Sequence, residues 1–279
     1  MKKHILPLLF LFCTTHAAQS PNPICFPETN VRIPMTSLTG ITETEFNRVL
    51  DKVEKIYAPI IEKAGGSLSV TRAWDDDKIN AKAWRVFSSW YIKMYGGLAR
   101  HKEVTSDGFT LVACHELGHH VGGFPREGWY SIEGQSDYYS VLKCAHKIWA
   151  DEDSVAIVKN MSVDALVREK CTTSIGNDKE RAECMRSSMA AKGLARMLAE
   201  FHFVSDPMPE FDTPDLTRVK KTYTSHPNAQ CRLDTNFQAA LCNVNPEIDI
   251  PNDRSDVGVC LFDKMGGRPA CWYAEKTAK

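Results

Sequence analysis

The chain has 279 residues, of which 43% are hydrophobic and 25% are charged, and its formal net charge is −1. This is the composition of an ordinary globular protein. The balanced charge provides no basic surface for nucleic acid or anionic lipid, so neither class of partner is expected.

Residues 1–18 have the order of a secretory signal peptide. Lys2 and Lys3 form a basic start, residues 5–13 form an apolar run, and small residues follow, with expected cleavage after Ala17 or Ala18. The run is too short for a permanent anchor, and no later stretch approaches the roughly 20 apolar residues of a spanning helix. We therefore expect a periplasmic or secreted protein with no integral membrane segment after signal removal.

After an irregular lead-in over residues 19–42, the hydrophobic pattern predicts a mostly helical chain with one small sheet. Spacing of three and four residues predicts helices over 43–63, 108–121, 131–149, 152–170, 178–203 and 228–242. Alternating, β-branched and aromatic residues predict strands over 67–72 and 81–95, the second as two strands or a hairpin. These elements favour a single α+β domain.

Turn and capping residues set the expected boundaries. Thr42 and Glu45 form a capping box for the first helix, and Ser131 is expected to cap the helix that ends near Trp149. The helix over 108–121 has its cap at 105–107. Gly96 and Gly97 predict a turn, and the four prolines within 205–227 predict an extended loop.

Nine of the ten cysteines follow the signal, and most should form disulfides in an exported chain. Cys171 with Cys184 and Cys260 with Cys271 are candidate local pairs. Because nine is odd, at least one thiol stays free or bonds another chain. Cys114 fits either a buried free thiol or a disulfide to Cys144. No C-x-x-C pair occurs, so a cysteine-ligated zinc site is not expected.

The strongest chemical signal is the segment His115-Glu116-Leu117-Gly118-His119, which lies inside a predicted helix. Histidines four positions apart lie on one helix face, so both rings can bind a single zinc ion. Glu116 can then face a zinc-activated water, take its proton and return it to the departing amine. The alternative is a helix that merely exposes two histidines.

A catalytic zinc site needs a third protein ligand. The metzincin pattern fails, because Pro125 stands where its third histidine should be. Glu133, 14 residues after His119 at the start of the next predicted helix, is the candidate ligand. Asp137, one turn further on, could accept the outer N–H of a ligand histidine. Alternatively, both are ordinary acidic residues near a helix N-terminus. The cofactor expected is one Zn²⁺ per chain.

These motifs resemble the gluzincin family that contains HtpX and the CAAX prenyl proteases. That family shows Asn-Ala before a substrate-facing strand, then H-E-x-x-H, E-x-x-x-D, and His-Pro followed by arginine. The matching positions here are Asn80-Ala81, His115 to His119, Glu133 with Asp137, and His226-Pro227 with Arg232. The resemblance spans about residues 43–240. The amino-acid sequences of residues 133–138 and 230–235 are most similar to those of exported bacterial members of the family.

The resemblance implies a zincin-like metallopeptidase domain over residues 43–245, followed by a cysteine-containing tail over 246–279. It implies that His226 donates to the oxyanion and that Arg232 supports the site. It also implies that the strand near residues 90–95 borders the active site and offers a free edge to an extended polypeptide substrate. The family's membrane helices do not appear in the pattern, so a membrane or lipidated substrate is not implied.

The function expected is therefore a zinc endopeptidase that acts on exported or envelope proteins. The main alternative is a binding or envelope-assembly protein that holds zinc on the same scaffold without turnover. A further alternative is hydrolysis of a non-peptide amide or ester by the same centre.

Overall fold

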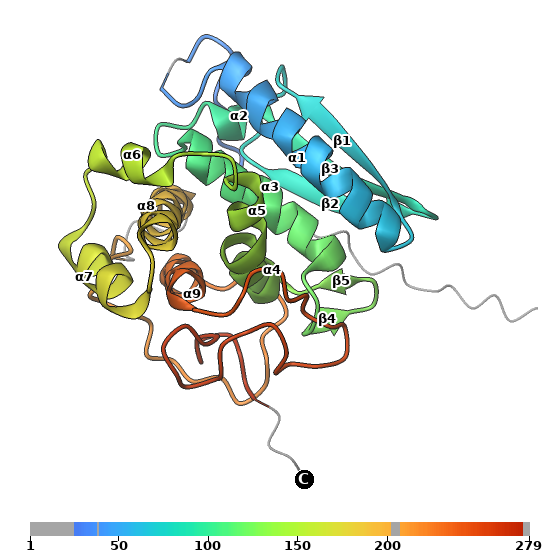
Figure 1. The fold of residues 1–279 in the computed structure, drawn as a ribbon. Helices are drawn as coiled ribbons and strands as arrows, with labels where there is room; N and C mark the ends of the chain where they lie inside the picture. The colour runs from blue at the N-terminus through green and yellow to red at the C-terminus, as the bar shows by residue number, and fades with distance from the viewer. Residues whose placement is uncertain (1–24, 38, 202–206, 276–279) are drawn as a thin grey trace, which may run out of the picture.

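The computed structural model describes residues 25–37, 39–201 and 207–275, so the predicted signal peptide lies outside it. A three-stranded mixed sheet lies at one edge of the molecule with helices packed against it, and a separate two-stranded hairpin is also present (Figure 1). The predicted α+β fold class is confirmed. No helix in the described part of the chain is long and apolar enough to cross a bilayer.

The first helix, α1 (Glu43–Lys63), begins at the predicted capping box, in which Thr42 and Glu45 bond to each other's main chain. Its apolar residues face the sheet because they recur every three or four positions. The buried ones are Phe46, Val49, Leu50, Val53, Tyr57 and Ile61. The helix thus covers one face of the sheet (Figure 1).

The sheet consists of β1 (Ser67–Ala73), β2 (Ala81–Val86) and β3 (Ser89–Tyr95), in the order β1-β3-β2. β2 and β3 form the predicted antiparallel hairpin, and β1 pairs with β3 in parallel. The prediction that residues 90–95 offer a free edge is wrong, because β3 is the central strand and both of its edges are paired. The edge nearest the candidate site belongs to β2.

Gly96 and Gly97 begin the short helix α2 (Gly96–Ala99) instead of forming an isolated turn. The next helix, α3 (Ser106–Val121), is capped by Thr105, whose side chain accepts a bond from the Gly108 amide. Nearly every residue of α3 is buried, because it runs between the sheet on one side and α8 on the other. The HExxH segment is therefore held in the interior.

The helix predicted over 131–149 is three consecutive pieces: α4 (Glu133–Tyr139), the π-helical turn η1 (Ser140–Ala145) and α5 (His146–Ile148). The prediction of Ser131 as its cap is wrong. Ser131 belongs to β5 (Tyr130–Ser131), which pairs with β4 (Arg126–Glu127), and its hydroxyl donates to the Gly123 carbonyl. Ile132 occupies the N-cap position without a side-chain bond.

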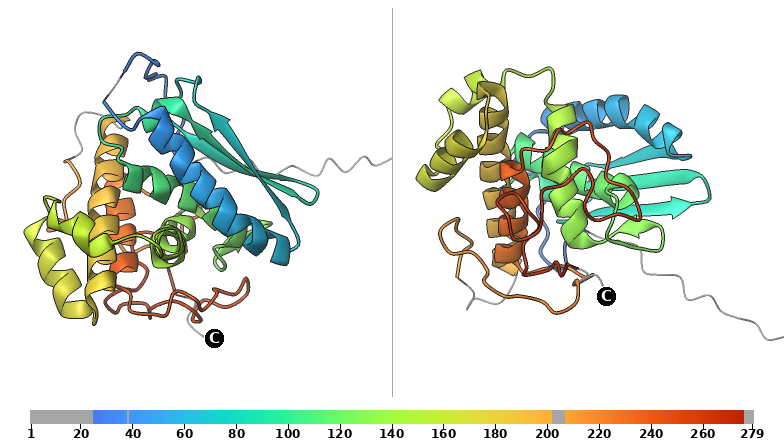
Figure 2. Two further views of the ribbon diagram at one scale, coloured as in Figure 1. Left: turned by 45° about the horizontal axis from the view of Figure 1, so that its top comes forward. Right: turned by 60° about the horizontal axis from the view of Figure 1, so that its bottom comes forward.

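The second half of the chain adds a helical layer. The helix predicted over 152–170 is two shorter ones, α6 (Ser154–Lys159) and α7 (Ala165–Ser174). The long helix α8 (Asp178–Phe201) and α9 (Ala229–Leu241) lie side by side (Figure 2). Among residues 207–228 no helix or strand is present, in line with the predicted extended loop.

Four disulfides are present among the described residues: Cys114–Cys144, Cys171–Cys184, Cys231–Cys271 and Cys242–Cys260. The predicted pair of Cys260 with Cys271 is wrong, because each bonds to a cysteine at one end of α9. Cys114 is bonded to Cys144 rather than free. Four disulfides are typical of an oxidising compartment.

The tail after residue 246 packs against α4 rather than standing apart (Figure 2). The Tyr138 hydroxyl donates to the Gly266 carbonyl, and Arg268 donates to the Gln135 side chain at 2.7 Å. The tail therefore braces the helix that carries Glu133.

The Cys114–Cys144 disulfide closes a 30-residue separation between α3 and η1. We predict that the double variant Cys114→Ala/Cys144→Ala loses about 3–4 kcal/mol of unfolding free energy, since its unfolded chain regains the loop entropy. Urea denaturation measures the loss. Fully reduced parent and variant should then unfold at nearly the same urea concentration. Equal midpoints for the oxidised proteins would contradict the prediction.

Candidate metal centre

Three side chains predicted as metal ligands converge at the junction of α3 and α4. One ligand atom from each of His115, His119 and Glu133 lies within 4.8 Å of the other two. The Nε2 of His115 is 3.2 Å and the Nε2 of His119 is 3.7 Å from a Glu133 oxygen. All three side chains are buried. The two histidines, one helical turn apart on α3, and Glu133, the first residue of α4, thus meet at one point.

The donor atoms fit a divalent cation. His115 Nε2, His119 Nε2 and Glu133 Oε2 are buried and make no hydrogen bond within the described residues. Buried polar atoms normally have partners, so three unsatisfied ones facing each other need an explanation. Two imidazoles and one carboxylate are the donors that a catalytic zinc ion takes. A bound zinc ion would satisfy all three atoms.

The outer nitrogen of each histidine is already engaged, which leaves Nε2 for a metal. His115 Nδ1 lies 2.8 Å from Asp137 Oδ1, and Arg232 donates to both oxygens of Asp137 at 2.8 and 2.6 Å. Burial alone would raise the pKa of Asp137, but the charges of Arg232 and His115 lower it well below its usual range. The carboxylate therefore stays ionised, in the state that accepts the His115 N–H.

His119 is held by neutral groups instead. Its Nδ1 lies 2.8 Å from the Ser131 carbonyl oxygen and 3.0 Å from the Ser136 hydroxyl. Burial lowers the pKa of His119 to about 4. The neutral ring, which is the form that binds metals, is thus favoured. Ser131 was predicted as a helix cap, and its contribution here is a main-chain carbonyl that the sequence did not reveal.

The candidate base, Glu116, is completely buried, and neither of its oxygens makes a hydrogen bond to a described residue. Burial, outweighing the opposing charge of His115, raises the pKa of Glu116 to about 8. Burial acts to raise the pKa of Glu133 as well, yet the nearby charges of His119 and His115 lower this pKa to about 2. The two glutamates therefore differ in proton affinity although both are buried near the same histidines.

His226 lies on the loop before α9, with its Nε2 3.6 Å from Glu133 Oε2 and its side chain 23% exposed. It is the most exposed of the predicted site residues and stands on the solvent side of the triad. Arg232 does not reach the triad centre. Its contacts are with Asp137, with His115 Nδ1 at 3.5 Å, and with Cys25.

Close packing of two helices brings Glu133 to the histidines. A Cβ atom on Gly118 would lie 3.0 Å from Ser136 Cα and 3.1 Å from its carbonyl oxygen. Such distances are tighter than most Cβ contacts, so a side chain here would push α4 away by a few tenths of an ångström, and glycine permits the close approach of α3 to α4 without that shift. The sequence places Gly118 within the motif but does not show what it faces.

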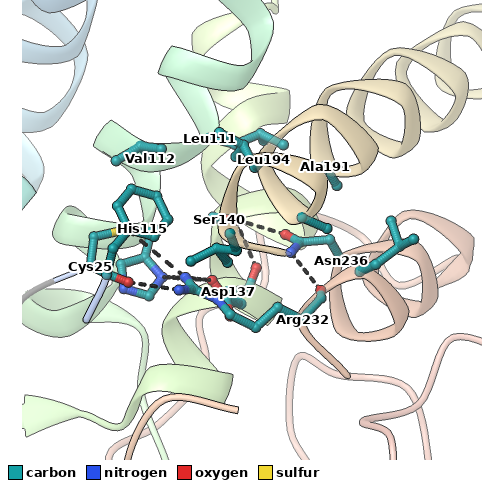
Figure 3. A pocket seen from close by; sticks show the side chains of 14 residues that line it. Cys25, Leu111, Val112, His115, Asp137, Ser140, Ala191, Leu194, Arg232 and Asn236 are labelled. Atoms are coloured by element: carbon teal, nitrogen blue, oxygen red, sulfur yellow. Dashed lines mark hydrogen bonds and ion pairs between the residues drawn. The ribbon is translucent and has the colours of Figure 1, made fainter. Parts of the chain in front are cut away.

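Cys25, which lies in the irregular lead-in, also reaches the site. It is buried and is the one cysteine outside a disulfide among the residues described. Its Sγ lies within 4.8 Å of a His115 nitrogen and a Glu116 oxygen. Figure 3 shows it beside Arg232 and His115, at a cavity of about 20 Å³ that Leu111 and Leu194 also line. The odd number of exported cysteines was the only sequence signal.

Comparison with known proteins adds no relative: no family model, no curated protein and no solved structure matches the chain. The assignment of chemistry therefore depends on the geometry of the site itself.

We predict that the parent binds about one zinc ion per chain and that Glu133→Gln retains much less after dialysis, because it loses the anionic ligand. Elemental analysis measures the zinc content. Chelation should also lower the melting temperature of the parent and change that of the variant little. Glu183→Gln, which alters a buried glutamate bonded to His146, is the matched control. Equal zinc content in parent and Glu133→Gln would exclude Glu133 as a ligand.

We expect Asp137→Asn to weaken zinc binding by roughly 10–100-fold, since it removes the anionic partner that orients His115. Competition with a chromophoric chelator gives the affinity. The control is Asp234→Asn, a buried aspartate on α9 that bonds to Gln230 and the Asp215 amide. If both variants bind zinc as tightly as the parent does, Asp137 has no part in holding the ligand.

Proposed function

We propose that this chain is a zinc endopeptidase. The observation that carries the proposal is the convergence of His115, His119 and Glu133 at atoms without hydrogen-bond partners, with Glu116 on the same helix. Three protein ligands leave a fourth position open, which is the arrangement of catalytic rather than structural zinc.

His115, His119 and Glu133 would hold the ion. Zinc at such a centre supplies a Lewis acid that polarises the substrate carbonyl and lowers the pKa of water toward about 7. In its ionised form, Glu116 takes a proton from the attacking water and delivers it to the amine that leaves. Because the Glu116 oxygens have no described partner, they are available to water or substrate.

His226 and Arg232 have different parts in this proposal. His226 stands beside Glu133 and is partly exposed, so its ring can donate to the oxygen that becomes negative during the attack. Arg232 acts through Asp137 by keeping it ionised and oriented toward His115. Arg232 is therefore proposed as a positioning residue for the metal ligand His115.

The order of the motifs supports the zincin-like fold and the gluzincin resemblance as part of the same proposal. An α+β domain with a helix-borne HExxH and a glutamate from the next helix is compatible with that fold. The four disulfides are compatible with a periplasmic or secreted location. We propose extended segments of exported or envelope proteins as substrates, since a sheet edge lies beside the metal ligands.

The decisive variant is Glu116→Gln, which keeps the shape of the side chain but not its basicity. We expect it to bind zinc as the parent does and to cleave unfolded casein about 100-fold or more slowly. Fluorescence of labelled casein fragments gives the rates, and zinc content shows that the site is intact.

Glu180→Gln, which alters a half-buried glutamate on α8 far along the chain from the motif, serves as the control and should cleave at the parental rate. Cleavage by Glu116→Gln at the parental rate would show that Glu116 is not the base. Zinc binding together with peptide binding, but no hydrolysis by the parent, would favour the non-catalytic alternative.

A further inference from the structure

A second pocket, of about 380 Å³, lies where the ends of α1, α3 and β2 meet, and none of the candidate metal ligands lines it. Arg85 of β2 and Arg126 of β4 both line this pocket, together with the exposed Lys63. The apolar part of its wall consists of Ile60, Trp90, Val121 and Ile250. We call it the arginine pocket. Its volume is within the range of about 300–1,000 Å³ that is typical of small-molecule sites.

The two arginines have no counter-charge. Both side chains are half-buried, and neither forms an ion pair with a carboxylate of the described residues. Burial, together with the charge of Arg126, lowers the pKa of Arg85 to about 10. Burial lowers the pKa of Arg126 as well. Asp249, the acidic residue among those that line the pocket, is exposed and pairs with neither arginine. Two like charges are therefore partly removed from water without compensation.

The buried arginines elsewhere in the described part of the chain are compensated. Three of them contact a carboxylate oxygen at 2.6 or 2.8 Å: Arg100, Arg186 and Arg232. The fourth, Arg268, has no carboxylate partner, but all three of its nitrogens donate to oxygen acceptors. Removing a charge from water is costly unless the charge is paired and hydrogen-bonded. Arg85 and Arg126 depart from this pattern, and a bound anion would restore it.

The guanidinium group of Arg85 is held in one orientation. Its carbon lies 3.3 Å from the centre of the Trp90 ring. It donates from Nε to His120 Nδ1 at 3.2 Å and from Nη2 to the His120 carbonyl at 2.9 Å. The other ring nitrogen of His120 lies 3.0 Å from the Tyr91 carbonyl oxygen, so it carries the proton and the ring is neutral. Arg85 Nη1 has no acceptor among the described residues and is left for a ligand.

Arg126 approaches from the β4–β5 hairpin. Its two terminal nitrogens donate to the Asn252 side chain and to the Trp129 carbonyl. The Trp129 ring also lies 5.0 Å from the Arg85 guanidinium, so both arginines contact one residue. The planar donor set of a guanidinium matches the oxygens of a carboxylate or phosphate group. Because the two groups are held by the protein beforehand, little ordering is left for an anion to impose.

We propose that the arginine pocket binds a small organic anion, whose carboxylate or phosphate group lies between Arg85 and Arg126. The apolar wall contacts the carbon skeleton of this ligand and excludes water from it. The inference does not depend on the zinc-peptidase function, since neither the candidate metal ligands nor Glu116 line the pocket.

The first experiment titrates the protein with four probes at constant ionic strength, and calorimetry measures the affinity. Phenyl phosphate is compared with inorganic phosphate, and benzoate with acetate. In at least one pair the aromatic probe should bind about 10-fold more tightly or better, because its ring is buried against the apolar wall. The tighter aromatic probe identifies the acidic group of the ligand. If no probe binds with a Kd below about 10 mM, the proposal is overturned.

The second experiment repeats the titration with variants of the pocket. Arg126→Gln should weaken binding about 10- to 100-fold, because it removes a charged donor. Arg85→Lys keeps the charge but loses the planar donor set, so it should also bind more weakly. The matched control is Arg168→Gln, which removes an exposed arginine on α7, across the molecule from β2 and β4 (Figure 1). If both pocket variants bind as the control does, the proposal is overturned.

A third arm separates the arginine pocket from the metal centre, since an anion can also bind a zinc ion. Glu133→Gln should bind the probe with parental affinity, because Glu133 does not line the pocket. A probe that this variant no longer binds lies at the metal, which would overturn the proposal. Melting curves without probe show whether each variant is folded, and Arg85→Lys decides the outcome if Arg126→Gln is not. A bound probe should raise the melting temperature of the parent and of Glu133→Gln alike.

Discussion

The buried carboxylate of Asp137 is the interaction on which the site depends. An ionised group in a protein interior is tolerated only when its charge is paired and its oxygens are bonded. Arg232 of α9 and His115 of α3 supply those partners, while Asp137 itself comes from α4. One charge therefore connects α3 and α4 to α9, whose Arg232 lies 95 residues beyond Asp137 in the sequence. The disulfides and the tail add to this connection but do not replace it.

Arg232, which pairs with Asp137, also binds the lead-in. Arg232 has more donors than Asp137 can accept, and one of them goes to the Cys25 carbonyl. A buried guanidinium needs all its N–H groups bonded, so the peptide segment completes the Arg232 environment as well as filling the space beside the metal ligands.

Much of the fold could be predicted because local rules decide it. The capping box of Thr42, the hairpin over residues 81–95 and the helix spacing around His115 depend on neighbours within a few positions. The side of the hairpin on which β1 pairs depends on contacts distant in sequence, and the prediction of a free β3 edge failed for that reason. The π-turn at Ser140 has no local signal, and the bonds of Cys231 and Cys242 join residues that only the folded tail brings together.

The candidate site, like the fold, could be predicted only where local rules decide the structure. The positions of His115, His119, Glu133 and Asp137 follow from helix geometry and from their order in the chain. The support of His119 by a main-chain carbonyl and the burial of Cys25 beside Glu116 could not be predicted, since a carbonyl leaves no trace in residue identity. A motif thus specifies the donors of a metal centre better than it specifies what surrounds them.

Gly118 limits how the motif can vary over evolution. Gly118, one of the two middle positions of the H-E-x-x-H segment, is the contact surface for α4. A methyl group at position 118 would require α4 to move away by a few tenths of an ångström, and Glu133 would move with it. The tolerance of this site to sequence drift is therefore limited by the clearance between α3 and α4.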